Sequence, residues 1–309
     1  MRVLNLVPSA DSVCFRQQVD VLERKGVDCR TLAVSEHGKG GSSRSPETYV
    51  RFVARAIQEA AGDHDIVHAN YGLVAPIAVA QPTRPVVVTF WGSDLMNEES
   101  WLPAVSRAVG RCADAAILPS EAMAPYFPHP YHHVPFGVDM DQFRPIPRAE
   151  ARASVGWESD RPIVLFPYTK ERDVKNYPRA ERVVERAAVD ADLRWITGVD
   201  HDEMPLYMNA SDAVLVTSNR ESGPMVVKEA AACNVPVVST DVGFARDVLE
   251  PVQHSAVGTT DAELVAALEA ILTAGERSDG REWIESWSLD EMAERILDLY
   301  ETLLDDRAG

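Results

Sequence analysis

Residues 213–240 read AVLVTSNRESGPMVVKEAAACNVPVVST, and the order of apolar and polar residues in this stretch decides the fold. An apolar, β-branched run at 213–217 is followed by a polar loop at 218–223. A helix-like run at 224–233 comes next, and a second β-branched run at 235–240. A strand, a loop, a helix and a strand in so few residues predict a parallel βαβ unit. The loop therefore lies at the carboxyl end of a strand, where open α/β sheets bind ligands.

The same alternation recurs on both sides of this unit and predicts an α/β fold with parallel sheets covered by helices on both faces. Further strands are predicted at 3–7, 29–34, 66–69, 86–90, 115–118, 132–134, 163–167 and 193–197. Helices are predicted at 15–25, 47–61, 101–112, 178–189 and 203–210. Two such α/β halves, each with its own sheet, fit the chain length of 309 residues.

A domain linker is predicted at residues 135–148, PFGVDMDQFRPIPR, because the stretch has three prolines, a glycine and no periodicity. The predicted domains are therefore 1–148, which includes the linker, and 149–288. Apolar residues recur at helical spacing between 289 and 304, which predicts an amphipathic C-terminal helix over 289–309 that packs across both domains. Two facing domains leave a cleft between the carboxyl ends of their strands.

Charge is distributed unevenly along the chain. Residues 1–148 contain 14 basic and 16 acidic side chains, whereas residues 149–309 contain 16 basic and 32 acidic ones; only five of the basic residues are lysine. This acidic surface argues against nucleic-acid binding, because phosphates are repelled. It is also typical of proteins adapted to a high-salt cytosol. The near-neutral first half is better suited than the second to approach an anionic membrane or a lipid-linked partner.

Neither a membrane span nor a disulfide framework is predicted. The longest apolar runs fall short of the roughly 18 residues that a spanning helix needs. The start, MRVLNLVPSAD, predicts a first strand rather than a signal peptide, and the protein is expected to be cytoplasmic. The four cysteines are widely separated and lack metal-ligand spacing, so buried free thiols are expected.

The loop and helix at 218–233 combine features of an anion site. Gly223 allows close backbone approach, and Pro224 suits the first position of a helix. The free amides of Met225 and Val226 then lie at the positive end of the helix dipole, which favours a phosphate. Glu229 lies one turn beyond Met225 among valines and alanines, so burial is expected, and a ligand's hydroxyls would satisfy its carboxylate.

A second basic element, YTKERDVKNYPRA at 168–180, follows the strand at 163–167. Arg172 and Lys175 are three residues apart at the ligand end of that strand, so both could bind one diphosphate. The alternative interpretation is surface charge that balances Glu171 and Asp173.

Other motifs give weaker signals. The dinucleotide fingerprint GxGxxG is absent, which argues against a dehydrogenase. HGKGGSSRSP at 37–46 lacks the spacing of a phosphate loop and is interpreted as a mobile polar loop. The histidines of PHPYHH lack the spacing of a metal site, so no metal is predicted.

The chain resembles the retaining glycosyltransferases of family 4, which have the GT-B fold. Glu221 and Glu229 match the family's E-x7-E signature, and PVVSTDVGFARDVLE at 236–250 resembles its continuation. VPFGVDMDQFRP at 134–145 and FWGSDL at 90–95 resemble its inter-domain segment and its G-S-D loop. The resemblance is weak over the first 60 residues.

The resemblance implies a nucleotide-diphosphate sugar as donor and no metal. Glu221 would contact hydroxyls of the donor sugar, and Glu229 would bind the nucleotide ribose. Arg172 and Lys175 would bind the diphosphate together with the loop and helix start, namely Ser222, Gly223, Pro224 and Met225. Glu221, Arg172 and Lys175 are therefore the predicted catalytic residues, with both glutamates orienting the donor rather than acting as a base.

The predicted acceptor side lies in the first domain and comprises His68, Trp91, Gly92, Ser93 and Asp94. His68 could face the cleft or be a packing histidine, and Ser93 and Asp94 could bind hydroxyls or cap the next helix. Here the chain departs from the family pattern. PSADSVCF at 8–15 replaces a Gly-Gly turn, and Trp91 stands where many members have histidine.

The predicted function is a retaining glycosyltransferase that transfers a sugar to a hydroxyl of a glycan, a lipid-linked or a small-molecule acceptor. A nucleotide-sugar epimerase of the same fold and a non-catalytic donor-binding subunit are the alternatives. A glycosidase is disfavoured, because two glutamates on one loop–helix unit need not flank a glycosidic bond. The protein could also contact the inner face of the membrane through its first domain.

Overall fold

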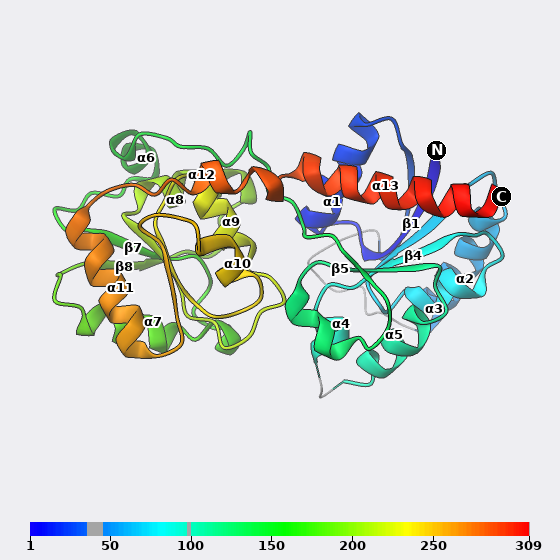
Figure 1. Cartoon of the computed structure of the whole chain (residues 1–309), viewed down its shortest axis with the longest axis horizontal. Coiled ribbons are helices and arrows are strands. Elements are labelled where there is room, and N and C mark those ends of the chain that lie inside the picture. Colours follow the sequence, from blue (N-terminus) through cyan, green and yellow to red (C-terminus); the bar gives the residue numbers. More distant parts are fainter. Residues whose placement is uncertain (36–45, 98–99, 309) are drawn as a thin grey trace. The chain divides into compact units, whose positions relative to one another are not determined.

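The computed structural model describes residues 1–35, 46–97 and 100–308 (Figure 1). By its contacts the chain divides into two compact units, of which the first comprises Met1–Gly137 with Leu289–Gly309 and the second Val138–Ser288. The predicted mobile loop at 37–46 lies, except for Pro46, outside the described residues. The two-domain α/β fold predicted from the sequence is confirmed, and each unit has its own parallel sheet.

The first unit contains a six-stranded sheet in the order β2-β1-β3-β4-β5-β6. All neighbouring strands are parallel. The strands are β1 (Arg2–Ser9), β2 (Asp28–Ser35), β3 (Ile66–Asn70), β4 (Val86–Thr89), β5 (Ala115–Leu118) and β6 (His132–His133). All six were predicted to within two residues at each end. Because β2 and β3 lie on opposite sides of β1, the chain reverses its direction across the sheet there.

Helices cover both faces of this sheet (Figure 1). One face packs against α2 (Pro46–Ala60), α3 (Ala75–Ala80) and α4 (Ser93–Met96). The other face packs against α1 (Val13–Arg24) and the C-terminal α13 (Leu289–Ala308). The helix α5 (Leu102–Gly110) contacts α3 and α4, and the 3-10 helix η1 (Glu121–Tyr126) follows β5. Apolar residues of α13, such as Met292 and Ile296, are buried in this second core, as the amphipathic pattern indicates.

The second unit contains a five-stranded parallel sheet in the order β11-β10-β9-β7-β8. The strands are β7 (Ile163–Phe166), β8 (Asp192–Trp195), β9 (Ala213–Val216), β10 (Val237–Thr240) and β11 (Ala256–Gly258). The sequence predicted the first four, and β11 was missed because its three residues, Ala-Val-Gly, form no β-branched run. The strands β8 and β9 lie on opposite sides of β7, so the chain reverses its direction between β7 and β9.

This sheet is also covered on both faces. The helices α8 (Met204–Ala210), α9 (Met225–Ala232), α10 (Ala245–Leu249) and α12 (Gly280–Trp283) lie on one side. The helices α7 (Tyr177–Arg186) and α11 (Asp261–Ala274) pack on the other face. The remaining elements are α6 (Arg148–Val155), which packs on α8, and the 3-10 helices η2 (Asp173–Lys175), η3 (His201–Glu203) and η4 (Glu285–Trp287).

The contacts group residues 138–148 with the second unit, whereas the sequence assigned them to the first domain. The guanidinium of Arg281 donates hydrogen bonds to the carbonyls of Met140 and Phe143, at 2.8 and 2.7 Å, and so ties this segment to the second unit. The contacts likewise place residues 289–309 in the first unit. Among the described residues, every helix is too short or too polar to cross a bilayer.

Candidate functional site

The loops that follow β7 and β9 lie side by side at the point where the second sheet reverses its strand order. The hydroxyl of Thr217 donates to the carbonyl of Asn176 at 3.0 Å, and the amide of Asn219 donates to the carbonyl of Val174 at 2.9 Å. These hydrogen bonds tie the two loops together. Such a reversal opens a crevice at the carboxyl ends of the strands, which is the usual ligand site of open α/β sheets.

Lys175 and Glu221 meet at this point. The Nζ atom of Lys175 donates to Oε1 of Glu221, and the Ser218 hydroxyl donates to the same oxygen at 2.8 Å. The ammonium also lies 3.9 Å from the ring centroid of Tyr168. Lys175 is only 5% exposed, and burial lowers its pKa while Glu221 opposes that effect. Two of the predicted catalytic residues are thus in direct contact.

The start of α9 is packed tightly. A Cβ atom added to Gly223 would overlap the ring of Phe244, so only glycine fits there. Pro224 is the residue before the helix, with an extended backbone, and the helix begins at Met225. The prediction that Pro224 is the first helical residue was therefore wrong by one position. The first amides of a helix have no acceptor within it, so those of Met225 and Val226 remain available to an anion.

Glu229 is buried in α9, as its apolar neighbours indicate, and is 6% exposed. Its Oε1 atom lies 3.1 Å from Nε2 of His201, at the start of η3. This hydrogen bond raises the pKa of His201 above its ordinary value. His201 was not singled out in the sequence, although its position shortly after β8 places it at the ligand end of the sheet.

Arg172 is exposed at the edge of a cavity of about 230 Å³ at the carboxyl ends of β7 and β8. Its positive charge contributes to the lowered pKa of Lys175, so the two cations lie in one neighbourhood. The cavity is also lined by Tyr168, Thr197 and Gly198.

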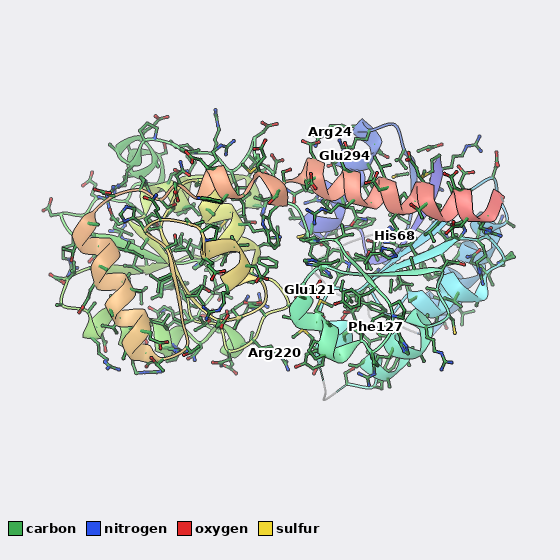
Figure 2. All side chains as sticks on the ribbon, viewed as in Figure 1. Arg24, His68, Glu121, Phe127, Arg220 and Glu294 are labelled. Carbon is green, nitrogen blue, oxygen red and sulfur yellow. The ribbon has the colours of Figure 1, made fainter. Side chains whose placement is uncertain are left out.

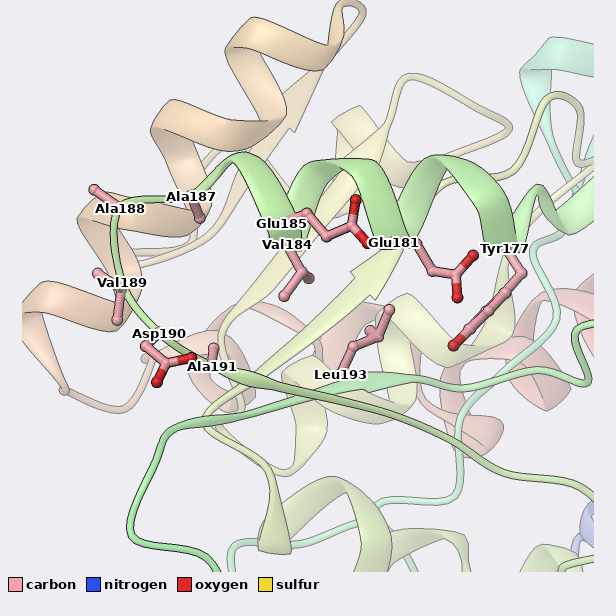
Figure 3. A pocket seen from close by; sticks show the side chains of 10 residues that line it. All are labelled: Tyr177, Glu181, Val184, Glu185, Ala187, Ala188, Val189, Asp190, Ala191 and Leu193. Carbon is pink, nitrogen blue, oxygen red and sulfur yellow. The ribbon is translucent and has the colours of Figure 1, made fainter.

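A larger cavity, of about 510 Å³, lies away from these residues (Figure 3). It is formed by α7, the loop after it and Leu193 of β8. Its lining contains none of the predicted site residues, and its carboxylates Glu181, Glu185 and Asp190 would repel a nucleotide diphosphate.

In the first unit, Asp94 joins two loops at the carboxyl end of the sheet. Its Oδ1 atom accepts hydrogen bonds from the amides of Trp91 and Gly92, both at 2.9 Å, and Oδ2 accepts from the amide of Gly72 at 2.8 Å. The side chain is fully buried, and burial raises its pKa to about 6 despite these bonds. Asp94 does not cap α4, because the residue before this helix is Gly92 and no side-chain capping hydrogen bond is formed; it fixes the amides of Gly72, Trp91 and Gly92 instead.

The same loops present polar side chains to solvent. The Ser93 hydroxyl lies 2.9 Å from the hydroxyl of Tyr71, and both residues lie at the ends of neighbouring strands. Tyr71 has a φ of 105° and Gly92 a φ of 110°. A φ of this kind is strained for tyrosine, and strained backbone often marks a ligand site. Trp91 packs against Phe136, with ring centroids 4.9 Å apart.

His68 is buried inside the first unit (Figure 2) and has no exposed surface. Its Nδ1 atom lies 2.6 Å from the hydroxyl of Tyr300 in α13, and its Nε2 atom lies 2.7 Å from the hydroxyl of Thr89. Burial lowers its pKa to about 3. Of the two roles that the sequence left open, His68 has the packing one in this structure, because alternation along β3 points it toward α13.

No group of three or more histidine, cysteine, aspartate and glutamate side chains in the described part of the chain is arranged to hold a metal ion. His133 of the PHPYHH stretch instead pairs with Glu121 at 3.5 Å.

Sequence reasoning also missed Tyr168, Ser218 and Tyr71. Tyr168 directly follows the predicted strand at 163–167, and Ser218 directly follows the one at 213–217. Their positions in the sequence therefore already indicated that both lie at the ligand end of the sheet. The strained backbone of Tyr71 had no such signal, because only the folded loop reveals it.

Two family models match the chain. Residues 2–135 match the glycosyl transferase 4-like domain, and residues 174–285 match the glycosyl transferases group 1. The first match spans the six strands of the first sheet, and the second spans the second sheet except β7, so together they account for most of the chain.

Solved structures agree on the fold. A sucrose-phosphate synthase from Thermosynechococcus elongatus superimposes with a TM-score of 0.82 at 19% identity, covering 99% of this chain and 100% of the other. HepE from Anabaena, solved in complex with UDP and glucose, gives a TM-score of 0.76 at 15% identity, covering 98% and 100%. The architecture is therefore the GT-B fold.

Curated relatives point to the same class. The chain is 25% identical to a D-inositol 3-phosphate glycosyltransferase of Geodermatophilus obscurus, over 81% of this chain and 70% of the relative. It is 26% identical to a GDP-mannose-dependent alpha-(1-6)-phosphatidylinositol monomannoside mannosyltransferase of Mycolicibacterium smegmatis, over 80% and 79%. The chain belongs to the family 4 glycosyltransferases with the GT-B fold, and it is a glycosyltransferase.

Proposed function

We propose that this glycosyltransferase uses a nucleotide-diphosphate sugar as donor, retains the configuration of the transferred sugar and transfers it to a hydroxyl of an acceptor. The observation that carries the proposal is the contact between Lys175 and Glu221 beside the start of α9. It brings a cation, a carboxylate and free helix amides together at the reversal point of the sheet. HepE, which has this fold, was solved with UDP and glucose, and this supports a nucleotide donor.

Different residues would bind the three parts of the donor, namely the ribose, the diphosphate and the sugar. Glu229 would accept hydrogen bonds from the ribose hydroxyls, and the amides of Met225 and Val226 would bind the diphosphate with Arg172. Glu221 would accept hydrogen bonds from the sugar hydroxyls while Lys175 holds its carboxylate. Ser222 and Gly223 would let the backbone pass close to the sugar.

In the proposed reaction the bond between the anomeric carbon and the diphosphate oxygen breaks, and a bond to the acceptor oxygen forms on the same face. The acceptor proton passes to a phosphate oxygen, and the nucleoside diphosphate leaves. Arg172, Lys175 and the helix start would stabilise the charge on the departing diphosphate, so the proposal requires no metal. Both glutamates orient the donor and neither acts as the base.

The acceptor would bind to the first unit, where Ser93 and Tyr71 present hydroxyls at the carboxyl end of the sheet. Trp91 offers an aromatic surface beside them. The names of two relatives contain D-inositol 3-phosphate and phosphatidylinositol monomannoside, and we therefore choose polyol phosphates and lipid-linked glycans as the first acceptors to test.

We also propose that the first unit contacts the inner face of the membrane. On α2, Val50 and Ile57 are 68% and 45% exposed, and Arg51 and Arg55 are exposed on the same helix. Exposed aliphatic residues beside arginines are suited to an anionic lipid surface. Replacing both Val50 and Ile57 by serine should lower sedimentation with anionic vesicles, and neutral vesicles are the control. Unchanged sedimentation would exclude this face of α2 as the membrane contact.

The donor proposal is tested by calorimetry in high salt with UDP, GDP and the corresponding nucleotide sugars. Binding of at least one nucleoside diphosphate is expected, and its absence would refute the proposal. A donor and acceptor screen then distinguishes the alternatives. Transfer with retained anomeric configuration supports the proposal, isomerisation of the donor without acceptor identifies an epimerase, and binding without turnover identifies a donor-binding subunit.

A further inference from the structure

Glu229 is held by a histidine from a distant part of the second unit. His201 lies 28 residues before Glu229, and its Nε2 atom is 3.1 Å from the Oε1 atom of the carboxylate. The side chain of Glu229 is 8% exposed and that of His201 is 26% exposed. A carboxylate this buried needs hydrogen-bond donors, and His201 supplies one.

Gln142 determines which nitrogen of His201 carries the proton. The amide nitrogen of Gln142 lies 2.8 Å from the backbone carbonyl of His201, which can only accept a hydrogen bond. The same nitrogen lies 3.1 Å from Nδ1 of the imidazole. Because an NH2 group donates to both, Nδ1 is the acceptor and the proton resides on Nε2. The Nε2–H group therefore donates to Glu229.

The surroundings keep this arrangement rigid. The ring of the buried Phe143 packs edge-on against His201, with centroids 5.3 Å apart. Gln142 and Phe143 belong to the segment that Arg281 ties to the second unit through the carbonyls of Met140 and Phe143. The imidazole thus has one orientation, and so does the carboxylate that it holds.

We propose that His201 is a positioning residue for the donor, which holds Glu229 so that its free lone pairs face the ribose hydroxyls, with Gln142 setting the tautomer. The inference rests on the proposed donor site. An ionised carboxylate accepts about four hydrogen bonds, so one from His201 leaves room for both hydroxyls of a ribose. Without His201 the buried carboxylate would lose its fixed orientation.

Protonation of His201 provides a second signature. Glu229 from α9, Asp202 from η3 and Asp139 from the 138–148 segment are the carboxylates that face it, and all three raise its pKa. The imidazolium neutralises Glu229 and makes it a weaker acceptor for hydroxyls. It also forces Gln142 to turn its amide, which breaks the bond to the His201 carbonyl. The ratio of the affinity for the ribonucleotide to that for its 2′,3′-dideoxy counterpart should therefore fall as pH drops through the pKa of His201.

The test is calorimetry on the full chain with UDP and GDP and with their 2′,3′-dideoxy counterparts. His201→Asn cannot reach Glu229, whereas His201→Gln keeps an NH group near the position of Nε2. For the nucleotide that the wild type binds, His201→Asn should lose about tenfold in affinity, which corresponds to about 1.4 kcal/mol. It should leave the affinity for the dideoxy form unchanged. His201→Gln should restore the ribose affinity and remove its pH dependence.

Equal losses for the ribose and dideoxy forms in His201→Asn would overturn the inference, because a general structural defect acts on both ligands alike. Unchanged ribose affinity in His201→Asn would overturn it as well. If the wild type binds neither UDP nor GDP, the donor proposal itself fails before any variant is compared. Should His201→Asn not fold, Gln142→Leu replaces it, with a loss of about threefold expected for the ribose form alone.

Discussion

Lys175 and Glu221 are 46 residues apart in the chain, yet the ammonium of one donates directly to the carboxylate of the other. Lys175 follows β7 and Glu221 follows β9, and these strands are neighbours because the sheet reverses its order between them. The pair is shielded by Tyr168 and Ser218. A carboxylate already paired with a lysine is suited to orient hydroxyls rather than to take up a proton during catalysis.

Substituting the two glutamates separately should divide their roles. We expect Glu221→Ala to lower turnover about a hundredfold with little change in nucleotide affinity, because the sugar loses its orientation. Glu229→Ala should weaken nucleotide binding about tenfold or more. Steady-state kinetics and calorimetry on both variants provide the measurement. The division of roles would be wrong if both variants lost nucleotide affinity equally.

Gly223 should tolerate no side chain. In Gly223→Ala the new methyl group would overlap the ring of Phe244, which directly precedes α10, so the loop must move away from Phe244. We expect donor affinity to fall about tenfold and the free energy of unfolding to fall by about 1–3 kcal/mol. The double variant Gly223→Ala with Phe244→Leu is the control, because a smaller side chain makes room for the methyl group. No recovery of affinity in the double variant would argue against this overlap as the cause.

Asp94 should make the first unit less stable as pH rises. Its pKa is about 6 in the folded chain against an ordinary value of 3.8, so the folded state binds the proton more tightly than the unfolded state does. The resulting stabilisation is fully present below pH 3.8 and is lost as pH rises through about 6. Its total is on the order of 3 kcal/mol.

Asp94→Asn removes this titration. Its amide oxygen can still accept from Trp91 and Gly92, but its NH2 group faces the amide of Gly72, which costs about 1–3 kcal/mol at every pH. Chemical denaturation of both proteins between pH 4 and pH 7.5 gives the comparison. The free energy of unfolding of the wild type, relative to the variant, should decrease across this range. A constant difference would contradict the prediction.

His68 should have the opposite pH dependence. Its pKa is about 3 in the folded chain against an ordinary 6.5, so the unfolded state binds the proton more tightly. The first unit should therefore lose stability as pH falls from about 6.5 toward 3, at about 1.4 kcal/mol per pH unit from this residue. His68→Gln should remove this part of the slope when measured by denaturation.

Tyr300→Phe tests the same contact from α13. It removes the hydroxyl that lies 2.6 Å from Nδ1 of His68 and leaves that nitrogen buried without this partner. We expect the free energy of unfolding to fall by about 1–2 kcal/mol at neutral pH. Tyr177→Phe, at a partly buried tyrosine in the second unit, serves as the matched control. Equal losses of free energy of unfolding in the two variants would show that the contact with His68 contributes no more to stability than the hydroxyl of Tyr177 does.

Much of the fold could be predicted because it depends on local patterns. Strands such as 86–90 are indicated by β-branched runs, and helices such as 47–61 are indicated by helical spacing of apolar residues. Shorter or less periodic elements could not be predicted in this way, as β11 and α6 illustrate. The helix α11 was also missed, although it has a complete capping box at Thr260 and Glu263, which is a local signal that the sequence does contain.

The sequence by itself determined that Glu221 and Glu229 lie on a loop and a helix at the ligand end of a strand, because their spacing and the Gly-Pro pair are local properties. Only the tertiary structure decided which groups hold them. Lys175 comes from the loop after β7 and His201 from the start of η3, and strand order brings both into reach. Tertiary structure likewise decided between the two roles of His68, because its partner, the hydroxyl of Tyr300, lies 232 residues further along the chain. Contacts between residues so far apart depend on how whole elements pack, which no local pattern records.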